Sequence, residues 1–122
     1  SAKLPEIAGK AALENTFFSS LYSPDDTSDL NKDFVAEYKK AYNTNPDVFA
    51  ALAYDSTLLV AKAIEDAGSA DPAKIAEAMA KIKGFKGVSG EVTFNEEHNP
   101  IKSAVIIEHK DGKQTFKTKV NP

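Results

Sequence analysis

The stretch that decides the fold runs from Phe49 to Gly68 and reads "FAALAYDSTLLVAKAIEDAG". Pro46, just before this stretch, disfavours helical structure at the preceding residue, and Gly68 suits the left-handed position that follows a helix. The spacing therefore predicts a helix, but its polar residues barely form a stripe. A helix that is apolar nearly all round must also be covered nearly all round.

The totals exclude several classes of protein. With 122 residues, 42% hydrophobic and 27% charged, the chain has the length and composition of one globular domain. Its formal charge is −3 and its basic residues form no run, which excludes a nucleic-acid footprint. The absence of cysteine excludes disulfides, zinc–thiolate sites and cysteine nucleophiles. The most apolar segment, 48–64, is interrupted by polar residues, so it contains no apolar run long enough to span a bilayer.

Two further helices are expected beside the central one. The first has Asp29 as its N-cap and an apolar face of Leu30, Phe34, Tyr38, Ala41 and Tyr42. The second has Asp71 as N-cap, Pro72 at its first position and a buried face of Ile75, Ala78, Met79 and Ile82.

Strand formers dominate the two ends of the chain. "NTFFSSLY" (15–22) predicts a first strand, and "GEVTFN" (90–95) alternates apolar and polar residues. "SAVIIEHK" (103–110) and "QTFKTKV" (114–120) flank Asp111-Gly112, a dipeptide typical of a type I′ hairpin turn. "GFKGVSG" (84–90), with three glycines, is expected to be a turn-rich connection.

These elements do not cover one another well. Three helices separate the first strand from the others, so we expect that strand to have a poor set of partners. The central helix needs cover on several sides, whereas its neighbours offer one apolar face each. We infer a piece of a larger α/β protein.

Candidate chemical groups are few. Asp55, within the central helix, could hold a ligand's ammonium group or orient a neighbouring polar group. The favoured interpretation is a carboxylate at a partly open edge, hydrogen-bonded to a nearby backbone amide. His98 in a turn and His109 at a half-exposed strand position are not expected to bind metal. Ser19 and Ser20 lack a Gly-x-Ser-x-Gly elbow. We therefore expect no catalytic residues, no metal site and no cofactor.

Three motifs carry a resemblance to a known family: P-x-x-x-A-A-L-A-Y-D (46–55), F-x-G-V-S-G-E-V-T-F (85–94) and the DGK turn (111–113). Together they resemble the C-terminal third of periplasmic binding proteins for branched-chain amino acids, the extracytoplasmic receptors of ABC importers. The resemblance implies an α/β chain, part of the two-lobed type I fold, with three helices, a first strand and a C-terminal antiparallel hairpin. It spans nearly the whole chain.

The resemblance also implies a division of the chain and a mechanism. Residues 1–25 would be a second-lobe strand and hinge, 26–100 a first-lobe helical segment, and 101–122 a hinge and second-lobe hairpin. The hinges would be Tyr22–Asp26 and Pro100–Ser103, and a bound amino acid would stabilise the closed arrangement of the lobes. A first-lobe sheet from polypeptide upstream would then cover the central helix.

The ligand-binding residues that the resemblance carries over lie at the start of that helix. Ala51 matches a position at which some relatives place a large aromatic residue, and Phe49 and Tyr54 are the other candidates near the cleft. The residues that hold the ligand's carboxylate and ammonium groups are expected upstream of Ser1. Simple packing is an equally good interpretation of both aromatic residues.

Other functions with the same sequence features stay open. The resemblance implies that the full-length protein lies outside the cytoplasm and has an amino acid and ABC permease subunits as its partners. The 122-residue piece itself is expected to self-associate or to exchange strands. The alternative within the fold is the ligand-sensing domain of a receptor, which only flanking sequence distinguishes. A small α/β enzyme would need a nucleophile–base pair, and the sequence offers none.

Overall fold

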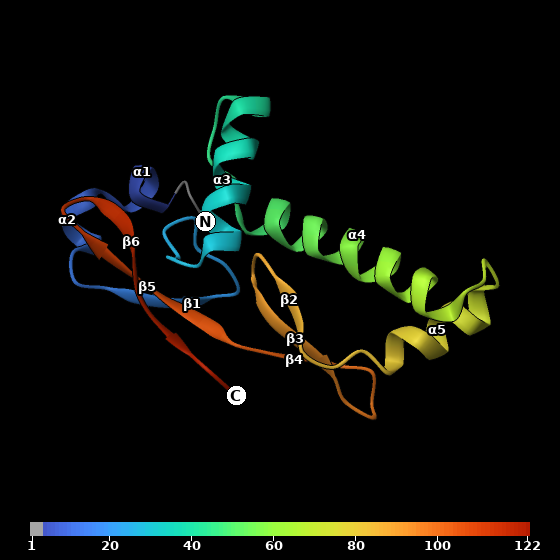
Figure 1. The fold of residues 1–122 in the computed structure, drawn as a ribbon. Helices are drawn as coiled ribbons and strands as arrows, with labels where there is room; N and C mark the ends of the chain where they lie inside the picture. Colours follow the sequence, from blue (N-terminus) through green and yellow to red (C-terminus); the bar gives the residue numbers. More distant parts are fainter. Residues whose placement is uncertain (1–3) are drawn as a thin grey trace.

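The computed structural model describes residues 4–122, so residues 1–3, where the expected second-lobe segment begins, lie outside the described part. Two three-stranded antiparallel sheets organise the chain (Figure 1). One has the order β1-β5-β6 and contains Phe17–Ser20, Ala104–Lys110 and Lys113–Val120. The other has the order β2-β3-β4 and contains Phe85–Gly87, Gly90–Phe94 and Pro100–Lys102.

The helices divide between these sheets. The long helices are α3 (Asp29–Tyr42), α4 (Val48–Ala67) and α5 (Pro72–Ala80), and together with the β2-β3-β4 sheet we call them the first body. The short helices α1 (Leu4–Ala8) and α2 (Lys10–Leu13) lie at the far end of the β1-β5-β6 sheet (Figure 1), and with it they form the second body. These two short helices were not expected from the sequence.

Several predicted details are confirmed. The C-terminal hairpin turns at Asp111 and Gly112, whose φ angles of 51° and 70° have the sign that a type I′ turn requires at both positions. Helix α4 ends at Ala67, and Gly68 follows it in the left-handed conformation. Helix α5 begins after Asp71, whose side chain accepts hydrogen bonds from the backbone amides of Ala73 and Lys74.

Other expectations were wrong. The first strand is well paired, because all four of its residues lie opposite β5 from Phe17↔Glu108 to Ser20↔Val105. The N-cap of α3 is Ser28, and Asp29 is the first helical residue. The expected connection 84–90 contains β2, which pairs with β3 across a two-residue turn at 88 and 89.

The packing of α4 answers the question raised by its sequence. Its buried residues form a stripe at helical spacing, Ala51, Asp55, Leu59 and Ala63. Leu59 and Ala63 pack with Ile82 and Val92 into a core that Ile75, Ala78 and Met79 of α5 cover. Ile82 is buried as predicted, but it follows the end of the helix at Ala80. Apolar side chains on both flanks of the stripe are exposed, among them Leu58 and Tyr54 on one flank and Val60 and Ile64 on the other. The described chain covers one face of α4 and leaves its two apolar flanks open to solvent.

Candidate functional site

A buried carboxylate fixes the start of α4 to the β2–β3 turn. Asp55 is 3% exposed, and its two oxygens accept hydrogen bonds from the backbone amides of Val88, at 2.8 Å, and Ser89, at 2.9 Å. The Ser89 hydroxyl donates a further hydrogen bond to the same carboxylate. Amides at the tip of a two-residue turn have no partner in the ladder, and Asp55 supplies one to each. The predicted hydrogen bond from a backbone amide is therefore confirmed, whereas the expected partly open position of Asp55 was wrong, because the side chain is buried.

Gly87 makes this contact possible. A Cβ atom at this position would lie 2.5 Å from the Asp55 carboxyl carbon, closer than real Cβ atoms approach any atom. The glycine before the turn is thus required for close approach of the carboxylate and not for an unusual φ angle. The F-x-G-V-S-G motif (85–90) thus forms the turn whose backbone amides and serine hydroxyl bind the Asp55 carboxylate.

The same network reaches the strand that leaves the first body. Lys102, the last residue of β4, donates a hydrogen bond of 2.6 Å from its Nζ to the Ser89 hydroxyl. Burial lowers the pKa of the Lys102 ammonium group; the Asp55 carboxylate opposes this shift, and the Lys119 cation adds to it. A chain of polar contacts therefore joins α4, the β2–β3 turn and β4.

Tyr22 lies in the segment that follows β1, and it anchors this segment to the first body. Its ring is 4% exposed and packs with Ala51 and Val88, and the Phe34 ring meets it edge-on at 6.3 Å between centroids. Burial, followed by the nearby carboxylates of Asp26, Asp25 and Asp55, raises the pKa of the Tyr22 hydroxyl. That hydroxyl is buried without a hydrogen-bond partner.

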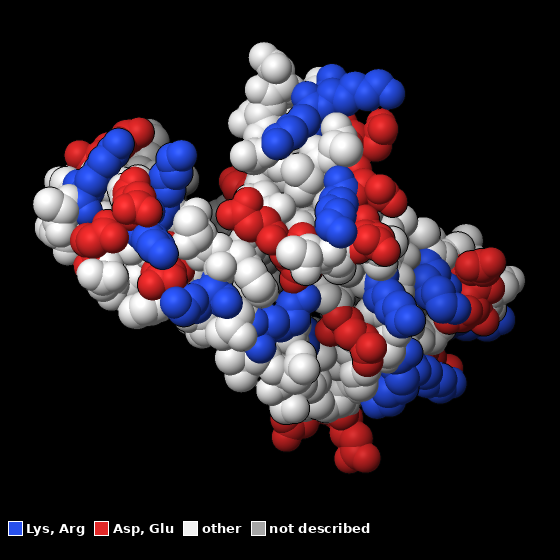
Figure 2. Space-filling model, turned by 60° about the vertical axis from the view of Figure 1, so that its left-hand side comes forward, with Lys and Arg blue, Asp and Glu red and all other residues white. Residues whose placement is uncertain are grey.

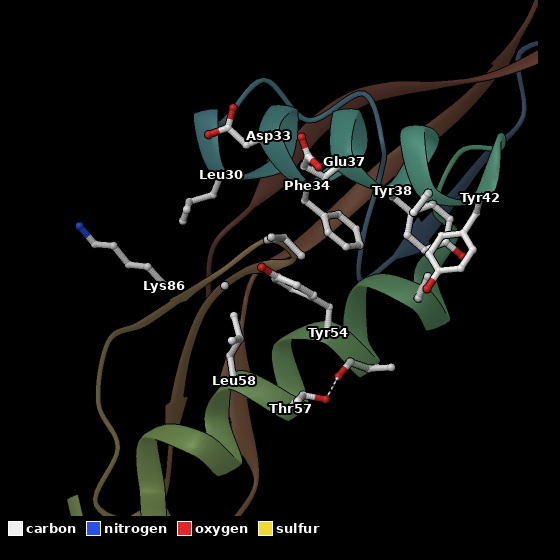
Figure 3. Close-up of a pocket in the computed structure, with 15 residues that line it drawn as sticks. Leu30, Asp33, Phe34, Glu37, Tyr38, Tyr42, Tyr54, Thr57, Leu58 and Lys86 are labelled. Carbon is white, nitrogen blue, oxygen red and sulfur yellow. Dashed lines mark hydrogen bonds between the residues drawn. The ribbon is translucent and has the colours of Figure 1, made fainter. Parts of the chain in front are cut away.

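Beside this anchor lies a groove between α3 and α4. Its volume is about 840 Å³, and Figure 3 shows Tyr54 projecting from α4 toward Phe34 on α3. Those two rings lie 4.8 Å apart between centroids, and Tyr38 and Tyr42 continue the aromatic lining along α3. Asp33 and Glu37 line it from α3 and Lys86 from β2, so the groove is apolar within and charged at its edge.

The three predicted ligand-binding residues have different environments. Phe49 is 76% exposed, and Tyr54 is 45% exposed and lines the groove. Ala51 has no exposed surface, because Tyr22 and Val88 cover it. The structure therefore does not bring the three side chains together around one cavity.

No metal centre emerges among the described residues. Within residues 4–122, no group of three or more His, Asp or Glu side chains is placed to hold a metal ion. His98 occupies a turn with a φ of 62°. The expectation of a half-exposed His109 was wrong: it is 3% exposed, with ring nitrogens 3.0 Å from the Thr16 hydroxyl and 3.2 Å from the Gln114 amide.

The surface is of mixed charge, and no described helix could cross a membrane. Lysine side chains and acidic side chains are interspersed over the face shown in Figure 2. No helix within residues 4–122 combines the length and the apolarity of a membrane span.

Comparison with known proteins shows the same fold in solved structures. The leucine binding protein LivK from Thermotoga maritima is 38% identical, with a TM-score of 0.87 over 100% of this chain and 35% of that one. LivJ, the branched-chain amino acid transporter substrate binding protein from Streptococcus pneumoniae, in complex with isoleucine, is 34% identical. Its TM-score is 0.84, over 100% of this chain and 35% of that one.

Curated sequences and a family profile agree with this. The leucine-, isoleucine-, valine-, threonine- and alanine-binding protein of Pseudomonas aeruginosa is 32% identical over 97 residues, which are 79% of this chain and 25% of that protein. The chain thus spans about a quarter to a third of the length of its relatives. The profile described as periplasmic binding protein matches residues 2–114. The chain therefore belongs to the periplasmic binding protein family, a family of binding proteins and not of enzymes, and corresponds to about one third of its Leu/Ile/Val-binding members.

Proposed function

We propose that this chain is the C-terminal third of an extracytoplasmic substrate-binding protein that delivers branched-chain or related amino acids to an ABC permease. The observation that carries the proposal is the agreement in fold over the whole chain with LivK and LivJ, at 38% and 34% identity. Both names refer to leucine or branched-chain amino acid binding, and the LivJ structure contains isoleucine.

The arrangement of the two bodies supports closure of lobes around the ligand. The second body, with α1, α2, β1, β5 and β6, would belong to one lobe, and the first body to the other. A ligand held between lobes stabilises the closed state by its differential affinity for that state. One wall of such a cleft buries too little of an amino acid to bind it tightly, so we propose that the rest of the site comes from other polypeptide.

Within this chain, Phe49 and Tyr54 have exposed surface available for a ligand. Ala51 lies directly behind Tyr22 and Val88, so a ligand would reach its methyl group only after one of those side chains moved.

A chimera tests the proposal. The segment of the Thermotoga maritima leucine binding protein that aligns with this chain is replaced by the 122 residues, and leucine binding is measured by titration calorimetry. The chimera is expected to bind leucine, and Tyr54→Ala is expected to weaken binding about tenfold, because burial of an aromatic ring contributes about 1–2 kcal/mol.

Tyr42→Ala is the matched control, because Tyr42 lines the same groove from α3 and is more exposed than Tyr54. The proposal would be wrong if the chimera melts cooperatively, like its parent, but shows no heat with leucine, isoleucine or valine.

A further inference from the structure

The junction between the two bodies is narrower than the hinge stretches expected from the resemblance. The β1–β5 ladder of the second body ends at Ser20↔Val105, and the β3–β4 ladder of the first body ends at Val92↔Lys102. Figure 1 shows β4 continuing directly into β5. Only Ser103 separates these two strands, so β4 itself is held by the first body.

The other connection is also held, except at one residue. Tyr22 is buried in the core of the first body. The segment after Tyr22 is held by the buried Asn31 of α3. The side-chain amide of Asn31 donates hydrogen bonds to the carbonyl groups of Ser23, Pro24 and Asp26. Leu21, between the end of β1 and this anchored segment, is exposed. Leu21 and Ser103 therefore lie between the segments that the two bodies hold, and the Ser20 hydroxyl spans Leu21 by donating a hydrogen bond of 3.1 Å to the Tyr22 carbonyl.

One ion pair crosses this junction. Lys119 on β6 of the second body lies 2.5 Å from the carboxylate of Asp26, in the segment that Asn31 holds to the first body. Their side chains are only 31% and 11% exposed, which limits screening by solvent. The other four ion pairs among the described residues each join residues of one helix or of one sheet.

We propose that the Asp26–Lys119 ion pair is a latch that holds the two bodies in their observed orientation, with Leu21 and Ser103 as the pivot. A rotation about the pivot must lengthen or break this contact, whereas every other described ion pair moves with its own body. The inference depends on the two-body arrangement and on no particular ligand, so failure of leucine binding in the chimera would leave it standing.

The natural absence of cysteine allows a direct distance measurement in the full 122-residue chain. Lys74→Cys on α5 and Lys113→Cys on β6 place nitroxide labels at exposed positions in different bodies. Double electron–electron resonance then reports the distribution of distances between the bodies, with labelled chains diluted by unlabelled ones so that only pairs within one chain contribute.

Lys119→Met and Asp26→Asn are expected to broaden and shift that distribution. Asp26→Asn can keep the side-chain oxygen that accepts the Ser28 amide, and it replaces the oxygen that faces Lys119 by an uncharged NH2 group. Lys119→Arg retains the cation and is expected to keep the narrow distribution. The matched control is Lys117→Met. Lys117 lies on the same strand as Lys119, and its ion pair with Glu108 of β5 lies within the second body.

The proposal is overturned if either Lys119→Met or Asp26→Asn leaves the distribution unchanged, or if Lys117→Met broadens it as much. Circular dichroism of each variant establishes that the change lies in orientation and not in loss of structure.

Discussion

Asp55 illustrates how a single residue connects distant parts of this chain. The sequence predicted a carboxylate bonded to a backbone amide, and the structure confirms this. The partners could not be identified beforehand, because Val88 and Ser89 are more than 30 positions away and only the tertiary fold brings them to α4. The glycines of the motif suggested a turn but gave no sign of the strand before it or of the carboxylate above it.

Replacement of Asp55 by Asn should destabilise the chain by about 2 kcal/mol. The variant loses charge-assisted hydrogen bonds and points an amide group at a backbone donor, and hydrogen bonds to charged groups contribute about 1.5–3 kcal/mol. Urea unfolding measures the difference. Asp66→Asn is the control, because its ion pair with Lys62 is exposed to solvent and is expected to contribute little to stability. Equal effects of the two substitutions would contradict the assigned role.

Asp26 should make stability depend on pH. Burial alone would raise its pKa, but the hydrogen bond and charge of Lys119, with the hydrogen bonds from Ser28, outweigh burial and hold the pKa below its ordinary value of 3.8. A lowered native pKa contributes stability that is present above 3.8 and is lost as the pH falls through the native pKa.

The unfolding free energy of the natural chain should therefore fall more steeply below about pH 4 than that of Asp26→Asn. Urea titrations at a series of pH values give both curves. If the unfolding free energies of the two chains fell equally steeply below about pH 4, Asp26 would not be the cause of the pH dependence.

At the scale of elements, features with local causes were predictable from sequence. The ends of α4, the Asp71 cap and the Asp111-Gly112 turn depend on residues within a few positions of one another. Strands β2 and β4 have three residues each, too few to show a period of two, and they exist because β3 pairs with both. The partner of β1 was missed because β5 lies almost 90 residues further along the chain.

Two neighbouring leucines on α4 test which of its faces needs cover. Leu59→Ala removes a buried core side chain and should cost about 2–5 kcal/mol. Leu58→Ala, one residue earlier on an exposed flank, should cost less than about 1 kcal/mol in the isolated chain. In the chimera, where polypeptide is expected to cover that flank, the cost of Leu58→Ala should rise. The same small cost in both proteins would show that the flank is a true solvent face.

At the scale of the whole molecule, the described chain has two bodies, two crossing segments and two uncovered flanks of α4. Alone, it offers at most one wall of a ligand cleft, and we predict that titration of the 122-residue chain with leucine gives no binding in the micromolar range. The chimera, titrated under the same conditions, is the positive control. Micromolar binding by the isolated chain would mean that a complete site lies within these residues.

The central claim is that the apolar flanks of α4, with Tyr54, Leu58, Val60 and Ile64, are shaped to be covered by polypeptide that the described residues do not supply. Size-exclusion chromatography with light scattering over a range of concentrations tests it most directly. Because exposed apolar surface and open strand edges favour association, we predict a molar mass above the 13.1 kDa of one chain, rising with concentration. A single 13.1 kDa species at every concentration, with a cooperative thermal transition, would contradict the claim.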